Sequence, residues 1–182
     1  MKAWQLIRKC LIEKHVKLEA KMIDGYDGYL AMYSFYNNKI SYDKEKLKQI
    51  MNKYKHKPWR KSVEPAITIF HEICHVYDRK FRTNYYYSSD INYRKSCSLV
   101  FSNEKRAKVV ESILGRIFFR GWFKLDYGKY DIKRTLTKHD FRIIKQTIKK
   151  ILKHAPFYYT LRANHIMNRA FHYYLRIEGS NK

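Results

Sequence analysis

The first forty residues change from a helical to an extended pattern of apolar positions. Side chains of one face recur every three or four residues near the N-terminus, which predicts a helix of about five turns. That face consists of Trp4, Ile7, Leu11, His15, Leu18 and Met22. Gly25 and Gly28 end the helix. Residues 29–36 (YLAMYSFY) and the run KISY flank Asn37-Asn38, so a β-hairpin is expected there.

Two helices are expected next. Asp43 can cap a helix over residues 44–55. Ser62 is then a candidate N-cap, and Pro65 suits a first helical turn. The apolar run AITIFHEICHVYDRKF that follows is therefore predicted to be helical.

The C-terminal half predicts three more helices separated by polar segments. Residues 83–98 are polar and rich in tyrosine, so a loop is expected there, after which Ser102 can cap the helix NEKRAKVVESILGRIFF. Residues 121–130 are expected to form another loop. Thr137 and Asp140 have the spacing of a capping box for a helix that ends near Lys153, and Pro156 precedes a last helix near residues 158–177.

These elements predict a mostly helical α+β fold with one small antiparallel sheet. The chain has 182 residues, enough to bury a sizeable core, and 45% of them are hydrophobic. No internal repeat or low-complexity linker divides it, so residues 1–182 are expected to form a single domain.

The charge of the chain is strongly basic. Lysine and arginine number 39 against 16 acidic residues, which gives a formal net charge of +23. Such a surface attracts nucleic acid, an anionic membrane or another polyanion. A coding bias toward Lys, Tyr, Asn and Ile explains part of the lysine excess but not the shortage of acids. A basic nucleic-acid-binding or virion structural protein is therefore one hypothesis, in which a zinc site is retained or vestigial.

The segment KHDFRIIKQTIKKILKHA supports that hypothesis because its two kinds of side chain separate on a helix. The apolar positions expected to face a core are Phe141, Ile144, Ile148, Ile151 and Leu152. The basic positions that gather elsewhere are Lys145, Lys149, Lys150 and Lys153. An ordinary solvated helix face would have the same pattern.

Cysteine usage and hydropathy favour a cytoplasmic or virion-associated protein. Cys10, Cys74 and Cys97 are odd in number and irregularly spaced, which is typical of a reducing compartment. No run of 18 apolar residues exists that could span a membrane. The N-terminal segment also lacks the cleavage site of a secretory signal.

The run FHEICHVYD, residues 70–78, has the composition of a metal site. His71 and His75 lie four apart, so a helix directs both imidazoles toward one point, where they suit Zn²⁺. Glu72 lies about 100° around the helix and can take a proton from a water bound there. Two histidine ligands and one carboxylate base predict hydrolysis of a peptide bond, with a peptide or protein as substrate. A structural helix with two hydrogen-bonded histidines is the alternative.

A catalytic zinc ion needs a third protein ligand, and no histidine occurs between His75 and His139. Carboxylates remain: Asp78, Asp90, Glu104 and Glu111. Glu104 is favoured because a second helix can bring it to the motif helix, where Ala107 permits close approach. Glu111, two turns on, competes for the role, and Asp90 lies in an expected loop. Asp78 suits a hydrogen bond to a ligand histidine better than coordination.

His71-Glu72-x-x-His75 followed by a helical Asn103-Glu104-x-x-Ala107 resembles the gluzincin metallopeptidases, especially small phage and bacterial types. With Asp78 included, the motif is also similar to that of the anthrax lethal factor peptidase domain. The resemblance covers residues 26–120 and implies a zincin-like core, an edge strand beside the motif helix and the glutamate helix. The basic helices of residues 131–182 are additional.

Two features of the family are not matched by one clear residue here. Thermolysin-like members have an aspartate four residues beyond the ligand glutamate, where this chain has Lys108; Asp78 is a candidate substitute. The resemblance also implies a tyrosine or histidine that stabilises the oxyanion. Candidate tyrosines follow each of the two helices, and they are Tyr85, Tyr86, Tyr87, Tyr127 and Tyr130.

Overall fold

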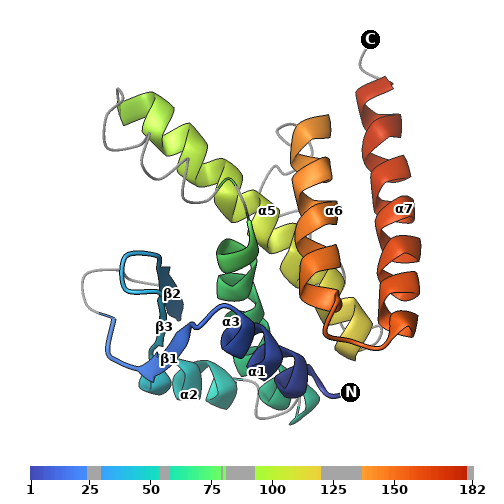
Figure 1. The fold of residues 1–182 in the computed structure, drawn as a ribbon. Helices are drawn as coiled ribbons and strands as arrows, with labels where there is room; N and C mark the ends of the chain where they lie inside the picture. The colour runs from blue at the N-terminus through green and yellow to red at the C-terminus, as the bar shows by residue number, and fades with distance from the viewer. Residues whose placement is uncertain (24–29, 54–57, 79, 81–92, 120–136, 180–182) are drawn as a thin grey trace.

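Helices α3 (Pro58–Tyr77) and α5 (Tyr93–Phe119) cross at the centre of the computed structural model (Figure 1). The structure describes residues 1–23, 30–53, 58–78, 80, 93–119 and 137–179. A small sheet and α2 (Lys44–Lys53) lie on one side of this crossing, and α6 (Lys138–Leu152) and α7 (Phe157–Gly179) lie side by side on the other. The mostly helical α+β class is confirmed.

The sheet has three strands in the order β1-β3-β2, which are β1 (Lys17–Ala20), β2 (Ala31–Ser34) and β3 (Lys39–Tyr42). β2 and β3 form the predicted antiparallel hairpin, with Tyr33 opposite Ile40. β1 pairs with β3 in parallel, so the sheet is mixed rather than wholly antiparallel as expected. β2 is an edge strand, and it packs against α3.

The first helix is shorter than its apolar pattern predicts. α1 is Ala3–Glu13, and β1 occupies positions expected to continue it. His15 has a φ of 51°, a left-handed conformation that turns the chain from α1 into β1. The buried face of α1 is Ala3, Leu6, Ile7 and Cys10. Of the predicted face, Ile7 is buried and Leu11 packs against the core, whereas Trp4 is exposed, so that face is only partly confirmed.

Helices α3 and α5 begin earlier than predicted. α3 begins at Pro58, whose missing N–H costs nothing in a first turn, and it continues through Pro65. Burial of Phe70 and Ile73 on one face stabilises this helix despite the lost hydrogen bond at Pro65. α5 begins at Tyr93, so Ser102 lies inside the helix and is not its N-cap.

The predicted caps of α2 and α6 are confirmed. Asp43 Oδ1 accepts a hydrogen bond from Lys46 N at 2.9 Å at the start of α2. At the start of α6, Thr137 Oγ1 accepts from Asp140 N at 3.2 Å, and Asp140 Oδ2 accepts from Thr137 N at 2.9 Å. Each cap satisfies backbone N–H groups that a helix leaves without an intrahelical partner.

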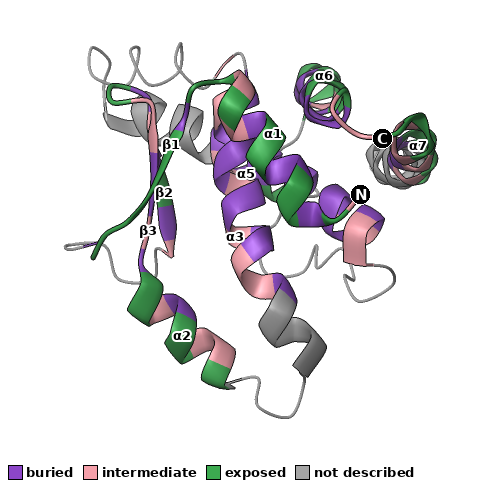
Figure 2. Cartoon of the chain, turned by 60° about the horizontal axis from the view of Figure 1, so that its bottom comes forward, coloured by how far each residue is buried: buried purple, intermediate pink, exposed green. Residues whose placement is uncertain are grey.

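Apolar side chains from α1, the hairpin, α3, α5, α6 and α7 form one core. Buried positions of the helices face this core, and exposed positions lie on the outside (Figure 2). Phe70 of α3 stacks on Phe118 of α5 at 5.7 Å between ring centroids, and Phe118 stacks on Tyr159 of α7 at 4.9 Å. On α6 the apolar positions predicted to face the core are buried or half-buried, and the four predicted lysines are exposed. Among the described residues, every helix is too short or too polar to span a lipid bilayer.

Candidate metal centre

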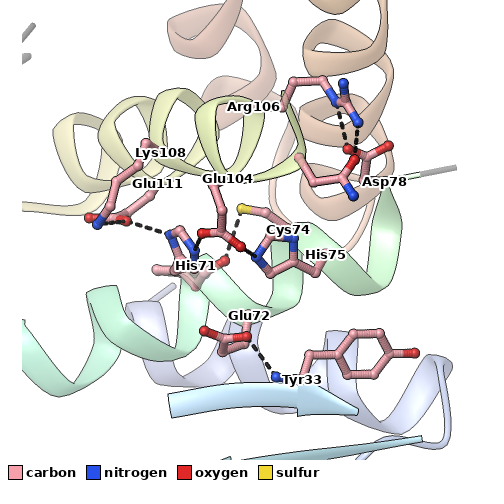
Figure 3. Close-up of polar contacts among 12 residues, drawn as sticks. Tyr33, His71, Glu72, Cys74, His75, Asp78, Glu104, Arg106, Lys108 and Glu111 are labelled. Atoms are coloured by element: carbon pink, nitrogen blue, oxygen red, sulfur yellow. Dashed lines mark hydrogen bonds and ion pairs between the residues drawn. The ribbon is translucent and has the colours of Figure 1, made fainter. Parts of the chain in front are cut away.

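His71 and His75 lie one turn apart on α3 and face α5 (Figure 3). Their ring centroids are 5.0 Å apart and nearly perpendicular, with an interplanar angle of 79°. His75 is buried and His71 is half-buried. Apolar neighbours on the same helix, such as Phe70 and Ile73, anchor this stretch in the core. The two rings are therefore held by a packed helix rather than by a loop.

Glu104 of α5 reaches both imidazoles. Its Oε2 lies 3.0 Å from His71 Nε2, and its Oε1 lies 3.2 Å from His75 Nε2. Ligands about 2.0–2.1 Å from a tetrahedral zinc ion would be roughly 3.3 Å apart, so these separations fit zinc. Among the described residues these three side chains can hold a metal ion together, each with one ligand atom within 4.8 Å of the others.

Ala107 permits the close contact between α3 and α5 that this geometry needs. It lies one turn beyond Glu104 and is only 2% exposed. Glu104 itself is well inside α5, because that helix begins at Tyr93. Its carboxylate is therefore too far from the helix N-terminus to be stabilised by the positive end of the helix dipole.

Glu111 lies on the opposite side of the His71 ring from Glu104. Its Oε2 is 2.9 Å from His71 Nδ1, and Lys108 Nζ donates to the same oxygen at 2.9 Å. The sequence leaves Glu111 as an alternative to Glu104 for the third ligand. In the structure Glu111 contacts Nδ1 of His71, the ring nitrogen that faces away from Glu104. Its position suits orientation of the imidazole, because a carboxylate there would keep a proton on Nδ1 and leave Nε2 for a metal ion.

Asp78 does not take that orienting position, contrary to the expectation from sequence. Its Oδ2 accepts from Arg106 Nε at 2.7 Å, and its Oδ1 accepts from Lys80 N at 2.8 Å. Arg106 also donates through Nη1 to Asp140 Oδ1 at 2.7 Å and through Nη2 to Asn103 Oδ1. The buried guanidinium attracts Asp78 because a buried carboxylate requires a charged partner. Asp78 thus joins the end of α3 to α5 and α6.

Glu72 projects from another side of α3, toward the sheet (Figure 3). It is 6% exposed, and its Oε2 accepts from the backbone N of Tyr33 in β2 at 2.8 Å. The edge strand therefore fixes the carboxylate that sequence reasoning assigned as the base. This contact could not be read from the motif, because it depends on how β2 packs on α3.

The electrostatics of the cluster favour a positive charge between the carboxylates. Burial opposes the charged ring of His71, but the carboxylates of Glu104 and Glu111 outweigh it and raise the pKa of His71 to about 10. Burial also opposes the charge of Glu104, yet the two imidazoles hold its pKa well below the usual range. In the same way His71 and Lys108 outweigh burial and lower the pKa of Glu111.

Cys74 is a core side chain, although it lies within the motif. It is buried, its Sγ donates to the carbonyl of Phe70 at 2.9 Å, and burial raises the pKa of its thiol well above the usual range. A thiol in this state is a poor metal ligand. The alternative ligand Asp90 and the candidate tyrosines at positions 85–87, 127 and 130 lie outside the described residues.

Comparison of the chain with protein-family models, with curated proteins and with solved structures gives no match. The geometry of the site therefore carries the functional argument.

Proposed function

We propose that this chain is a zinc-dependent peptidase of the gluzincin type. The observation that carries the proposal is the carboxylate of Glu104, which lies within 3.2 Å of Nε2 of both motif histidines. Such a set of two imidazoles and one carboxylate matches the three protein ligands of a catalytic zinc site. The arrangement of motif helix, glutamate helix and edge strand supports a zincin-like core.

The number of N–H protons on the His71 imidazole also supports a bound cation. Both ring nitrogens of His71 lie within 3.0 Å of carboxylate oxygens. A neutral imidazole carries a single N–H and can donate to only one of them. The second contact needs an added proton or a metal ion. Zinc at Nε2, with the proton retained on Nδ1 toward Glu111, satisfies both sides of the ring.

Bound zinc would supply Lewis acidity, which lowers the pKa of water and polarises a peptide carbonyl. The chain's own residues would perform the proton transfers. Glu72 Oε2 is occupied by the Tyr33 amide, whereas Oε1 forms no hydrogen bond within the described part of the chain. Oε1 is therefore the atom that would take the proton of the attacking water and pass it to the leaving nitrogen.

The first test measures the metal. Protein purified without added zinc should contain about one zinc ion per chain, and His71→Ala or Glu104→Ala should lose it. His139→Ala is the matched control, because this histidine is exposed on α6. A wild-type chain that contains no zinc and takes up none when it is added would refute the proposal.

The second test separates metal binding from catalysis. Glu72→Gln can still accept the Tyr33 amide through its side-chain oxygen, so fold and zinc content should persist. Proteolysis should fall by roughly 10²-fold or more, because a neutral amide cannot act as the base. Equal cleavage of a peptide library by the variant and the wild type would show that Glu72 is not the base.

A further inference from the structure

A cavity at the C-terminal end of α3 adjoins the candidate metal centre. Its volume is about 290 Å³. It is lined by the end of α1, the β2–β3 hairpin, the last turn of α3 and one residue of α6, namely Lys14, Tyr33, Asn38, His75, Val76, Tyr77, Asp78 and Lys150. This volume is at the lower limit of ligand pockets, so it suits one side chain or a chain end rather than a folded partner.

Two of the lining residues belong to the proposed catalytic machinery as well. His75 contributes its Nε2 to the metal cluster, and Tyr33 donates its backbone N to the base Glu72. A group that enters the cavity therefore lies beside both the metal ligand and the residue that fixes the base. This placement indicates a pocket for a part of the substrate close to the bond that is cleaved.

The charge of the cavity selects for an anion. Lys14 and Lys150 are exposed, and neither forms an ion pair within the described part of the chain. The one lining carboxylate, Asp78, is already occupied by Arg106 and by the backbone N of Lys80. Lys14 Nζ lies 5.1 Å from the centre of the Tyr77 ring, a cation–π contact that holds the ammonium at the cavity.

The rim of the cavity is held in an unusual backbone conformation. His15 and Asn38 have φ values of 51° and 47°, in the left-handed region that non-glycine residues seldom occupy. The Asn38 amide donates to the carbonyls of Lys14 and His15 at 2.7 and 3.0 Å and accepts from the Tyr33 hydroxyl at 3.1 Å. These bonds fix the corner that carries Lys14, and backbone strain of this kind concentrates at functional sites.

We infer that this cavity binds a carboxylate of the peptide substrate next to the cleaved bond. The inference rests on the proposed peptidase function for the nature of the substrate. Two sources share this chemistry: the side chain of an Asp or Glu within the peptide, and the carboxylate at its C-terminus. Lys14 and Lys150 would contact the anion from α1 and α6 respectively.

The test uses zinc-loaded Glu72→Gln protein, which should bind peptides without cleaving them, and three peptides of one length. The first is neutral and capped at both ends, the second has one Gln replaced by Glu, and the third is neutral with a free C-terminus. We expect one carboxylate peptide to bind roughly tenfold tighter than the neutral one in calorimetric titrations. Preference for the second peptide identifies a side-chain carboxylate, and preference for the third identifies a chain end.

Charge-reversal variants test whether the preference for a carboxylate peptide arises in the cavity. Lys14→Glu and Lys150→Glu should each abolish it, and Lys150→Gln should reduce it with less risk to the fold. Lys149→Glu is the matched control, because Lys149 is exposed on the same helix and does not line the cavity. The inference is overturned by equal binding of the three peptides, by no binding of any, by a preference that survives both reversals, or by its loss in Lys149→Glu.

Failure of this inference can be distinguished from failure of the proposed function. Cleavage by the wild type, compared with Glu72→Gln, tests the peptidase function and needs no carboxylate preference. Cleavage without preference would leave the peptidase and remove the carboxylate pocket. Preference without cleavage of any peptide would leave the pocket and remove the peptidase.

Discussion

Two clusters of charged side chains lie between α3 and α5, and their charges are balanced in different ways. In the arginine cluster, Arg106 binds Asp78 and Asp140 through two nitrogens, each at 2.7 Å. Asp140 also caps α6, and Asp78 accepts a backbone N–H, so both carboxylates have permanent donors. This cluster is complete without any added ion.

In the histidine cluster Glu111 is paired with the permanent cation Lys108, whereas within the described residues no lysine or arginine is paired with Glu104. Glu104 faces two imidazoles, and a histidine is charged only when it takes up a proton. Glu104 lies two residues before Arg106 on α5, so the arginine cluster fixes the part of α5 that presents Glu104. This difference supports the proposal that the histidine cluster binds an added cation, whereas the arginine cluster joins the helices.

Removal of Arg106 should have the largest effect on stability. Arg106→Met leaves two buried carboxylates without their cation, and such a loss typically costs about 3–5 kcal/mol of unfolding free energy. Urea denaturation measures it. Arg142→Met is the control, since Arg142 is exposed on α6 and should change stability by less than about 0.5 kcal/mol. A loss below about 1 kcal/mol in Arg106→Met would mean that the arginine cluster does not hold the helices together.

Removal of Glu104 should have little effect on stability without zinc and a large effect on the stabilisation that zinc provides. Without zinc, Glu104→Gln should change the unfolding free energy by about 1 kcal/mol or less, because this side chain is 39% exposed. With free zinc at about 1,000 times its dissociation constant, the wild type should gain about 4 kcal/mol and the variant much less. Equal zinc stabilisation of the two proteins in thermal unfolding would contradict the ligand role of Glu104.

Glu111 and Asp78 can be compared directly for the orienting role. Glu111→Ala should weaken zinc binding by about 10–100-fold, the usual effect of losing a carboxylate behind a ligand histidine. Asp78→Asn should leave zinc affinity within a few-fold and lower stability instead, because it removes a partner of Arg106. Competition with a chelating dye measures both affinities. The reverse order of effects would restore the role predicted for Asp78 from sequence.

Local sequence signals predicted those parts of the fold and site that depend on neighbouring residues. The caps at Asp43 and Thr137, the hairpin turn at Asn37-Asn38 and the shared face of His71 and His75 follow from spacings of a few residues. The sequence also predicts that a second helix brings Glu104 to that face, because this placement requires only that α5 pack against α3.

Features that depend on tertiary contacts were predicted poorly. Arg106 attracts Asp78 away from the histidines, and no local pattern reveals a buried cation on another helix. The stretch after Glu13 has an apolar pattern that also suits a helix, but pairing with β3 makes residues 17–20 a strand. Glu111 is a rival ligand in the sequence, because its seven-residue spacing from Glu104 predicts the helix face it occupies but not which nitrogen of His71 it contacts.

A third charged group, centred on Glu13, lies nearer the surface than the arginine and histidine clusters. Glu13 joins α1 to α6 and α3 through Lys153, the Tyr77 hydroxyl and His154 Nε2, the last at 2.6 Å. Partial burial opposes the charge of Glu13, but these partners outweigh it and lower its pKa to about 2. Because the folded pKa lies below the unfolded value of about 4.3, the carboxylate stabilises the fold above pH 4.3 and loses this effect as pH falls toward 2.

Glu13→Gln should therefore lower stability at pH 6 by about 1 kcal/mol or less, and the difference from wild type should vanish as the pH approaches 2. Urea denaturation at several pH values measures it. Glu45→Gln is the control, because its pair with Lys48 on α2 is exposed and should contribute less. A difference that stays constant with pH would show that the loss arises from packing rather than from charge.

The smallest effect on the fold should come from the exposed basic face of α6. Arg142 and Lys145 lie one turn apart there, and within the described residues neither is in an ion pair. If this face binds nucleic acid, as the net charge of +23 suggests, duplex DNA should bind at low salt and dissociate steeply as salt rises. Each charge reversal, Arg142→Glu or Lys145→Glu, should reduce the slope of log affinity against log salt by roughly 1.

Lys44→Glu on α2 is the matched control for these reversals, because Lys44 is exposed on the other side of the α3–α5 crossing. It should leave the slope unchanged if binding is local to α6, and an equal reduction would indicate attraction by net charge alone. Undetectable binding at low salt would exclude this surface as a nucleic-acid site. None of these three changes should alter unfolding free energy by more than about 0.5 kcal/mol. On this hypothesis the solvated cations of α6 would contribute to binding, whereas the buried Arg106 contributes to the fold.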